Sequence, residues 1–327
     1  MVAEDSLVHG AAFLRVSARR FPLKSANRIM SLGTLAMLAW PGLAQFQDVK
    51  LFRLPGADPA AGMGCIVNNS GAMVAAARVG GVTRVYVVKD DKVDELLPLP
   101  GDERVNYSDI NDSGTVVGLS GTGSFDFQLK GTIWRNGVPS PLPVPPPSQA
   151  NSIIQFRPFA MNNAETILGQ SVEYLGGSTI NPIVKLVVLQ GSTFTEIPAL
   201  AVPVDINNPG DVLVRVLPNQ TNGTTGGFFL WRNGSFTQVE VPAGTTLRGL
   251  NDQREMLGML GNGASYFLLQ GKEVVAIPDL VGSFFTEFFR LNNKGETCGA
   301  ARNWTPQGTV QYHQVVRQVR PSKPPLK

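Results

Sequence analysis

Histidine and cysteine are scarce in this chain of 327 residues, which contains two of each. His9 lies in a stretch that we interpret as a leader, so His313 is the only histidine left for chemistry in the rest of the chain. A Ser-His-Asp or Cys-His nucleophile would have to use His313, which falls in an expected strand and is interpreted as structural. Two cysteines cannot form a zinc site alone. We therefore expect no metal, no cofactor and no catalytic residue.

The chain also contains few charged residues and no long segment with a helical period. Charged residues make up 16% of the chain, and much of the net charge of +3 belongs to the leader. The remainder is close to neutral, which argues against a nucleic-acid partner. The glycines lie in expected hairpins, outside the strand–loop–helix context of a phosphate-binding loop. No long stretch between residues 48 and 320 has a helical period, and 35 Gly with 24 Pro favour a turn-rich, all-β chain.

What the chain does contain is a short phrase written six times. Each copy has an apolar residue, an Asn, then Asn or Asp, a short loop and an apolar run, as in "DINDSGTVVGL" and "DINNPGDVLVR". The leading asparagines recur every 41 to 51 residues, at Asn68, Asn111, Asn162, Asn207, Asn251 and Asn292. A period of this size predicts a repeat architecture.

Each repeat contains two expected hairpins. The phrase itself is a tight turn, because Asn and Asp bond their own backbone and Gly supplies a positive φ. The copies at Ala164-Glu165 and Gln253-Arg254 lack the Gly, so we expect those two turns to differ in detail. A second hairpin follows in most repeats, with Asn136-Gly137 and Asn233-Gly234 between apolar runs. Each repeat therefore predicts a four-stranded antiparallel unit, which is typical of a propeller blade.

The last repeat lacks an outer strand, whereas residues 48–56 form an expected strand with no partner of its own. Pairing of this segment with a strand near 310–319 would complete the last blade and cover its open edge. The sequence thus predicts a closed six-bladed β-propeller over 48–320, with the last blade completed by the N-terminal strand. An open β-solenoid is the alternative.

The phrase "INDSGTVVG", followed by "WRNG" and a strand that ends in Leu-Pro, resembles the HAF-type extracellular repeat. The resemblance covers nearly the whole chain after residue 48. It implies a secreted bacterial repeat protein of propeller-like fold, and it implies no particular activity.

The two ends of the chain are interpreted as lying outside the fold. Basic residues precede the apolar stretch 29–40 and the small residues of "PGLAQ", which predicts a signal peptide over 1–47 with cleavage near Ala44. A signal-anchor or a helix of the mature protein is the alternative. Residues 321–327 are an expected disordered basic tail. We therefore expect a secreted or periplasmic monomer with no membrane span after cleavage.

The two cysteines flank the first and last copies of the phrase. Cys65 precedes the first and Cys298 follows the last. In a closed ring these two repeats are neighbours, so an oxidising compartment would allow a disulfide that locks the seam. Two buried free thiols are the alternative.

Several acidic residues are candidates for chemistry. Asp109 and Asp205 begin copies that imitate a calcium loop, but neither has a Glu at the twelfth position. Carboxylate pairs could serve a glycosidase, although no spacing joins two of the candidates. These candidates are Asp94, Glu95, Asp102, Glu103 and Glu287. Four Phe surround Glu287 in "FFTEFFRLNN", and packing between blades is the favoured interpretation.

Two functions from different classes follow. The first is a secreted, non-catalytic module that binds an extracellular polymer or protein through its loops. Its expected partner loop lies in 143–158, where Pro145, Pro146 and Pro147 make the chain stiff. The alternative is a propeller glycoside hydrolase or lyase that uses carboxylates at the mouth of the channel. Convergence of acidic residues from several blades on one mouth would favour the enzyme.

Overall fold

The structure is a computed structural model that describes residues 49–52, 54, 56–57, 62–90, 92–122, 128–177, 181–218, 226–261, 265–278, 285–304 and 310–319. The expected leader 1–47, its cleavage site near Ala44 and the tail 321–327 lie outside the described residues. Within the described ranges, no helix has the length and apolar character needed to cross a bilayer.

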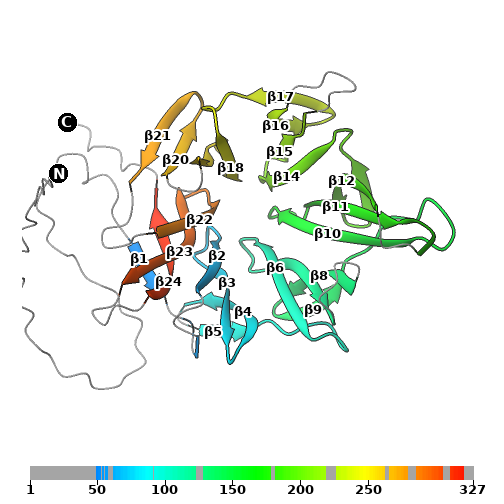
Figure 1. The fold of residues 1–327 in the computed structure, drawn as a ribbon, viewed down its shortest axis with the longest axis horizontal. Helices are drawn as coiled ribbons and strands as arrows, with labels where there is room; N and C mark the ends of the chain where they lie inside the picture. The colour runs from blue at the N-terminus through cyan, green and yellow to red at the C-terminus, as the bar shows by residue number, and fades with distance from the viewer. Residues whose placement is uncertain are drawn as a thin grey trace, which may run out of the picture.

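The described strands form six four-stranded antiparallel sheets arranged around a common centre (Figure 1). No α-helix occurs among the described residues. The prediction of an all-β propeller made of four-stranded antiparallel units is confirmed.

The first three sheets, each written from its innermost to its outermost strand, are β2 (Gly62–Val67), β3 (Met73–Val79), β4 (Val82–Lys89), β5 (Lys92–Glu95); β6 (Arg104–Ile110), β7 (Val116–Gly121), β8 (Leu129–Arg135), β9 (Val138–Pro141); and β10 (Ile153–Met161), β11 (Ile167–Tyr174), β12 (Ile183–Gln190), β13 (Thr193–Glu196). The other three are β14 (Ala201–Ile206), β15 (Val212–Val216), β16 (Gly227–Arg232), β17 (Ser235–Val239); β18 (Thr245–Leu250), β19 (Met256–Leu260), β20 (Ser265–Gln270), β21 (Glu273–Ile277); and β22 (Phe285–Leu291), β23 (Glu296–Trp304), β24 (Val310–Gln318), β1 (Val49–Phe52).

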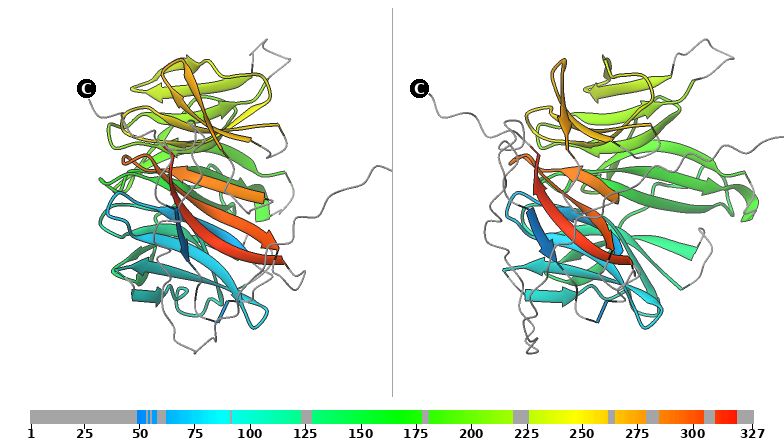
Figure 2. Two further views of the ribbon diagram at one scale, coloured as in Figure 1. Left: turned by 90° about the vertical axis from the view of Figure 1, so that its left-hand side faces the viewer. Right: turned by 60° about the vertical axis from the view of Figure 1, so that its left-hand side comes forward.

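The sixth sheet combines the two ends of the described chain. Strand β1 pairs antiparallel with β24, with Val49 opposite Arg317 and Phe52 opposite Gln314, and the two strands lie side by side in Figures 1 and 2. The segment that the sequence left without a partner is therefore the outer strand of the last sheet. His313 pairs through its backbone with Ala301, as expected for a strand residue.

Apolar clusters lie between neighbouring sheets. Alternation of side chains along each strand sends one set toward the preceding sheet and the other toward the following one. Six clusters of described residues each join two neighbouring sheets. One of them joins the first sheet to the last, through Cys65 and Met73 on one side and Cys298 and Val316 on the other. The innermost strands also follow one another, and β22 contacts β2.

The second hairpins form as expected. Asn136 and Gly137 both have positive φ, at 52° and 77°, and Asn233 and Gly234 repeat this at 49° and 83°. Positive φ at both central residues is the mark of a type I′ turn, whose twist matches that of the strands it joins.

Candidate functional site

The six repeated asparagines gather at one mouth of the channel, each at the end of an innermost strand. In Asn111, Oδ1 accepts hydrogen bonds from the backbone N–H of Ser113 and of Thr115, at 3.2 and 3.0 Å. The N–H four residues after each of the other leading asparagines makes the equivalent bond. These asparagines are buried, so their side chains satisfy turn amides that have no water available.

The two turns without glycine keep the same geometry, which corrects the expectation that they differ. Glu165 and Arg254 adopt φ of 56° and 59° at the position where Gly114 has 85°. Each donates its N–H to the leading Asn carbonyl, at 3.1 and 3.0 Å. Both side chains form ion pairs, Glu165 with Arg135 and Arg254 with Asp211.

The amide groups of the leading asparagines link one sheet to the next. Asn68 Nδ2 donates to the carbonyl of Asn111 at 2.7 Å, and Asn292 Nδ2 donates to that of Asn68 at 3.1 Å. The same bond joins Asn162 to Asn207, Asn207 to Asn251 and Asn251 to Asn292. Asn111 is the exception, because its buried Nδ2 has no hydrogen-bond partner. It precedes the longest interval between copies of the phrase.

A second ring is built from the residue after each leading asparagine. The backbone N–H of each donates to the side-chain Oδ1 of its counterpart in the following sheet, at 2.6 to 2.9 Å, and the sixth bond returns to the first sheet. The members in order are Asn69, Asp112, Asn163, Asn208, Asp252 and Asn293. All six sheets are thus joined at this mouth by directional bonds as well as by apolar packing.

Two carboxylates in this second ring each lie between two asparagines. Oδ2 of Asp112 accepts from Nδ2 of Asn69 at 2.9 Å and of Asn163 at 2.6 Å. Oδ2 of Asp252 accepts from the asparagine amide on either side in the same way. The four asparagine amides of the second ring are therefore bound to two carboxylates.

A buried charge cluster lies deeper in the channel, two residues before the leading asparagines. The side chain at this position is acidic in Asp109 and Asp205 and basic in Arg290. Each innermost strand shifts register just before this position. Such irregularities turn side chains away from the regular alternation. The two aspartates are recognisable in the sequence because they imitate a calcium loop, whereas Arg290 has no such signal. Alignment of the six phrases nevertheless places all three in register.

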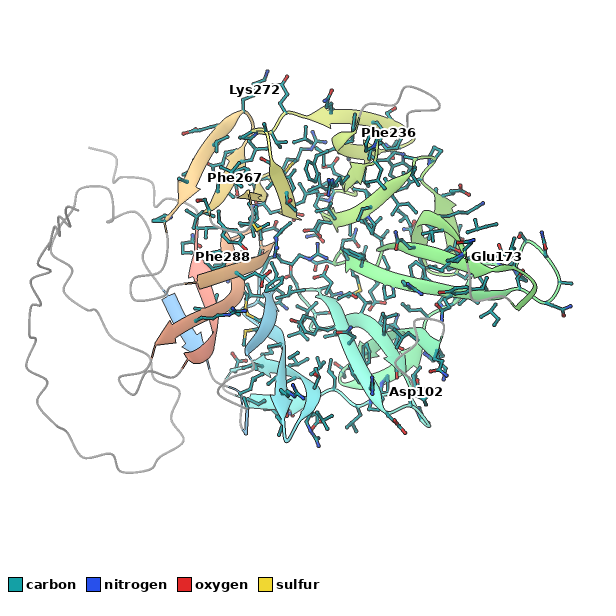
Figure 3. The ribbon with its side chains drawn as sticks, viewed as in Figure 1. Asp102, Glu173, Phe236, Phe267, Lys272 and Phe288 are labelled. Atoms are coloured by element: carbon teal, nitrogen blue, oxygen red, sulfur yellow. A yellow bond between two sulfur atoms is a disulfide. The ribbon has the colours of Figure 1, made fainter. Side chains whose placement is uncertain are left out.

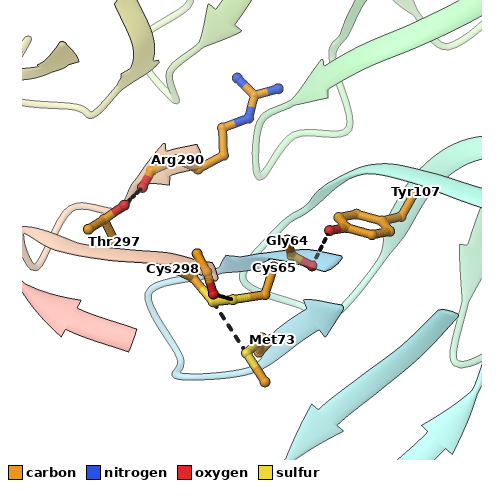
Figure 4. Close-up of a disulfide and its surroundings, with 8 residues drawn as sticks. Gly64, Cys65, Met73, Tyr107, Arg290, Thr297 and Cys298 are labelled. Carbon is orange, nitrogen blue, oxygen red and sulfur yellow. Dashed lines mark hydrogen bonds between the residues drawn. A yellow bond between two sulfur atoms is a disulfide. The ribbon is translucent and has the colours of Figure 1, made fainter. Parts of the chain in front are cut away.

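Arg290 crosses the centre of the ring, where Figure 4 shows its guanidinium away from its own strand. Nη1 is 2.9 Å from Oδ1 of Asp205 and also donates to the carbonyl of Val204. Nη2 donates to the carbonyl of Phe159 at 2.6 Å. One side chain of the last sheet therefore binds the third and fourth sheets.

Both aspartates also accept backbone hydrogen bonds. Asp109 accepts from the N–H of Ile110 and of Met161, at 2.9 and 2.8 Å. Asp205 accepts from the corresponding N–H groups of Ile206 and Leu250, at 2.9 and 2.8 Å. Each carboxylate therefore ties its own sheet to the next one, which is a structural use of the residues that imitate a calcium loop.

Burial governs the ionisation of this cluster. It raises the pKa of Asp109, although Arg290 and the backbone N–H groups oppose the shift. It raises the pKa of Asp205 to about 6, again against the attraction of Arg290. Burial disfavours the Arg290 cation, but the two carboxylates outweigh it and raise the pKa of the guanidinium.

Asp109, Asp205 and Arg290 line a small cavity of about 70 Å³, together with five of the six leading asparagines and all six residues of the second ring. Four acidic residues from three sheets meet here, Asp109, Asp112, Asp205 and Asp252, which is the convergence that the enzyme hypothesis requires. All four accept hydrogen bonds from backbone N–H groups. Such a volume holds a few water molecules. No group of three or more His, Cys, Asp or Glu side chains suited to a metal ion occurs in the described ranges.

The other acidic candidates are spread over separate parts of the molecule. Glu95 pairs with Arg84 in the first sheet, and Asp94 pairs with Lys92. Asp102, labelled in Figure 3, lies ahead of the second sheet, where it binds Ser120 and Lys130. No ion pair involving Glu103 is found in the described part of the chain.

The aromatic segment around Glu287 serves the core in part. Glu287 lies on β22, 3.0 Å from Arg248. Phe288 is buried and meets the ring of Tyr266 edge-on at 5.1 Å. The guanidinium of Arg248 lies over the ring of the half-buried Phe289, 5.6 Å from its centre. Packing between sheets therefore accounts for Phe288.

Cys65 and Cys298 form a disulfide, with their Cα atoms 5.4 Å apart (Figure 4). Both are fully buried beside Met73 in the cluster between the first and last sheets. The possible disulfide across the seam is therefore present, and the alternative of two free thiols is wrong. Pro145, Pro146 and Pro147 lie on the surface, in the connection between β9 and β10.

No protein-family profile and no curated protein matches the chain. Several solved structures resemble it at low identity. A protein of unknown function from Dyadobacter fermentans is 13% identical with a TM-score of 0.45, over 82% of this chain and 100% of that one. Puromycin hydrolase is 12% identical with a TM-score of 0.48, and the match spans 84% of this chain but 57% of the hydrolase. The propeller domain of the Trilobed protease from Pyrococcus furiosus, described as having an open velcro topology, is 10% identical with a TM-score of 0.37 over 78% and 81%. These likenesses extend to the general fold alone.

Replacing Asn207 by Ala should lower the free energy of unfolding by about 2 kcal/mol and leave any partner binding unchanged. The substitution removes the bonds of its side chain to Asp211 and to the Asn251 carbonyl, and leaves a buried turn N–H unsatisfied. Urea denaturation and a binding assay on the same variant provide the measurement. Asn111→Ala is the matched control and should cost less, because Asn111 makes no bond to the next sheet. Lost binding at unchanged stability would instead identify a ligand site.

Proposed function

We propose that this protein is an exported, non-catalytic binding or scaffold module whose six sheets are the blades of a closed ring. Closure is supported by the N-terminal strand in the last sheet, by the disulfide between the first and last sheets, and by the asparagine rings that return to the first sheet. Export is supported by the expected leader and by the resemblance to the HAF-type extracellular repeat. The partner would be an extracellular polymer or protein.

The observation that carries the non-catalytic proposal is the engagement of the channel-mouth carboxylates. Asp109 and Asp205 accept backbone N–H groups, and Asp112 and Asp252 accept asparagine amides. A general acid or nucleophile needs a carboxylate that can reach substrate in a site of matching size. The cavity is instead small, about 70 Å³, and Arg290 lines it. Binding is then left to the connections between strands, which vary while the strands pack.

The alternative function is a glycoside hydrolase or lyase. It is favoured by the convergence of four carboxylates on one mouth and by the pKa of about 6 for Asp205, which would suit a general acid. The two functions separate in one experiment. A turnover screen of the purified protein on polysaccharides and glycans should detect no product, whereas a glycan and protein array should detect retention. Turnover that Asp205→Asn abolishes would establish the enzyme.

Deleting residues 145–151 should abolish binding to the retained partner without unfolding the ring. The segment joins two strands outside the sheets, and the four residues that remain equal the length of the connection 197–200 between β13 and β14. Binding measured by calorimetry, with circular dichroism to verify the fold, provides the test. A shortening of the connection 240–244 serves as the matched control and should bind normally. Unchanged affinity after the 145–151 deletion would place the binding surface elsewhere on the ring.

A further inference from the structure

The connection between β9 and β10 is long and rich in proline. It runs over residues 142–152, whereas those at 197–200 and 240–244 are much shorter. It leads from the outermost strand of one sheet to the innermost strand of the next, so it crosses from the periphery toward the channel. Its first half reads Leu-Pro-Val-Pro-Pro-Pro over residues 142–147.

This proline segment is exposed and apolar. Val144 is 49% exposed, and Pro143, Pro146 and Pro147 are also exposed. The sequence contains no charged side chain between Arg135 and Arg157. A neutral surface of this kind offers nothing to a nucleic acid or to a charged polymer, which are recognised through opposite charge.

The backbone of the segment favours one extended conformation. Leu142 makes the last sheet bond, from its N–H to the Gly131 carbonyl at 2.8 Å. Beyond it, proline occupies every position of 143–147 except Val144, so the ring of each fixes φ and removes the N–H donor. Such a run prefers the polyproline II helix, with exposed carbonyl groups. It cannot dock by adding a strand to a sheet, because that mode needs N–H donors.

Both ends of the segment are held. Leu142 is bound to the sheet, and the other end is fixed at Ser148. The N–H and Oγ of Ser148 donate to Oε1 of Glu173, at 2.7 and 2.8 Å. Glu173, labelled in Figure 3, is a buried residue of β11 with 6% exposure. Anchors on both sides keep the prolines extended before a partner arrives, which lowers the ordering cost of binding.

We propose that residues 142–147 are a polyproline II ligand that docks in an aromatic-lined groove of a partner protein. Pro143 and Pro146 are three residues apart, so one turn of the polyproline helix places both rings on the same side, as in PxxP recognition. Pro143 and Pro146 enter the groove, Val144 contacts its wall, and the Glu173–Ser148 bonds hold the ligand in place. This proposal rests on the proposed binding function and names its partner class.

The test is calorimetry of the full protein against a panel of purified domains that read polyproline, of the WW, SH3 and EVH1 types. At least one domain that tolerates an uncharged ligand should bind. The double variant Pro143→Ala/Pro146→Ala should weaken that binding at least tenfold, with its melting temperature unchanged. Pro242→Ala, in the corresponding connection of another sheet, is the matched control and should bind normally. Glu173→Ala should weaken binding severalfold while the proline contacts remain.

Two results would overturn the proposal: no domain of the panel binds, or the double variant binds as tightly as the wild type. Either leaves the proposed function standing if an array partner is still retained by the protein. Conversely, turnover of a glycan substrate would end the non-catalytic proposal while the polyproline measurements remain valid.

Discussion

Replacing both Cys65 and Cys298 by Ala is expected to lower the free energy of unfolding by about 5 kcal/mol. The disulfide joins residues 233 positions apart, so it constrains almost the whole described chain in the unfolded state. Both cysteines are also fully buried in the cluster between the first and last sheets, so the lost sulfur atoms leave a space there. Chemical denaturation of the double variant and of the wild type provides the measurement.

Wild-type protein unfolded and reduced with dithiothreitol serves as the control, because it has lost the bridge but kept both side chains. It should lose most of the same stability. A double variant as stable as the oxidised wild type would show that the strand β1 and the asparagine rings hold the seam alone. A variant that fails to fold would be consistent with the prediction only if reduction of the wild type also unfolds it.

Replacing Arg290 by Met is expected to cost about 3–5 kcal/mol, because it leaves the Asp205 carboxylate buried without its cation. The carbonyls of Phe159 and Val204 also lose their donor. Asp205→Asn in the Arg290→Met background removes the uncompensated charge and should restore part of the stability. Urea denaturation of the two single variants and the double variant measures this coupling. Strictly additive losses would show that the pair does not interact.

The loss in Arg290→Met should also depend on pH in a defined direction. Burial raises the pKa of Asp205 to about 6 even beside Arg290, so the folded state prefers the protonated acid. Protonated Asp205 contributes its full share to the free energy of unfolding below the ordinary pKa of an aspartate, near 4. That contribution is lost as the pH rises through the pKa of Asp205 in the folded state. Without Arg290 the folded pKa rises further. The loss of unfolding free energy caused by Arg290→Met should therefore be largest at neutral pH and become smaller toward pH 4.

The local turns were predictable because they depend on residues close together in the chain. Asn111 satisfies N–H groups two and four residues further on, which any Asn at the head of such a turn can do. The exceptions were instructive: Glu165 and Arg254 were expected to change the turn, yet they adopt the left-handed conformation of glycine. Their ion-pair partners, Arg135 and Asp211, lie too far away in the sequence to be recognised from the turn alone.

The charge cluster in the channel illustrates the opposite case. Asp109, Asp205 and Arg290 occupy one position of the repeat, so the sequence places them in register. Whether that position faces the channel or a neighbouring sheet depends on the irregularity that precedes it in each innermost strand. An inserted residue reverses the side-chain alternation. Sequence alone therefore could not bring the three side chains together.

Taken alone, the sequence determined the repeat, the four-stranded antiparallel unit and the partner strand at the N-terminus, because period, turn chemistry and apolar alternation are local properties. It also identified the two cysteines that meet. Only the tertiary structure decided that the second turn residues, from Asn69 to Asn293, bind one another around the mouth, and that Arg290 reaches the third and fourth sheets. Those contacts join residues of different sheets, whose distances and directions are set by how the sheets pack rather than by any short stretch of chain.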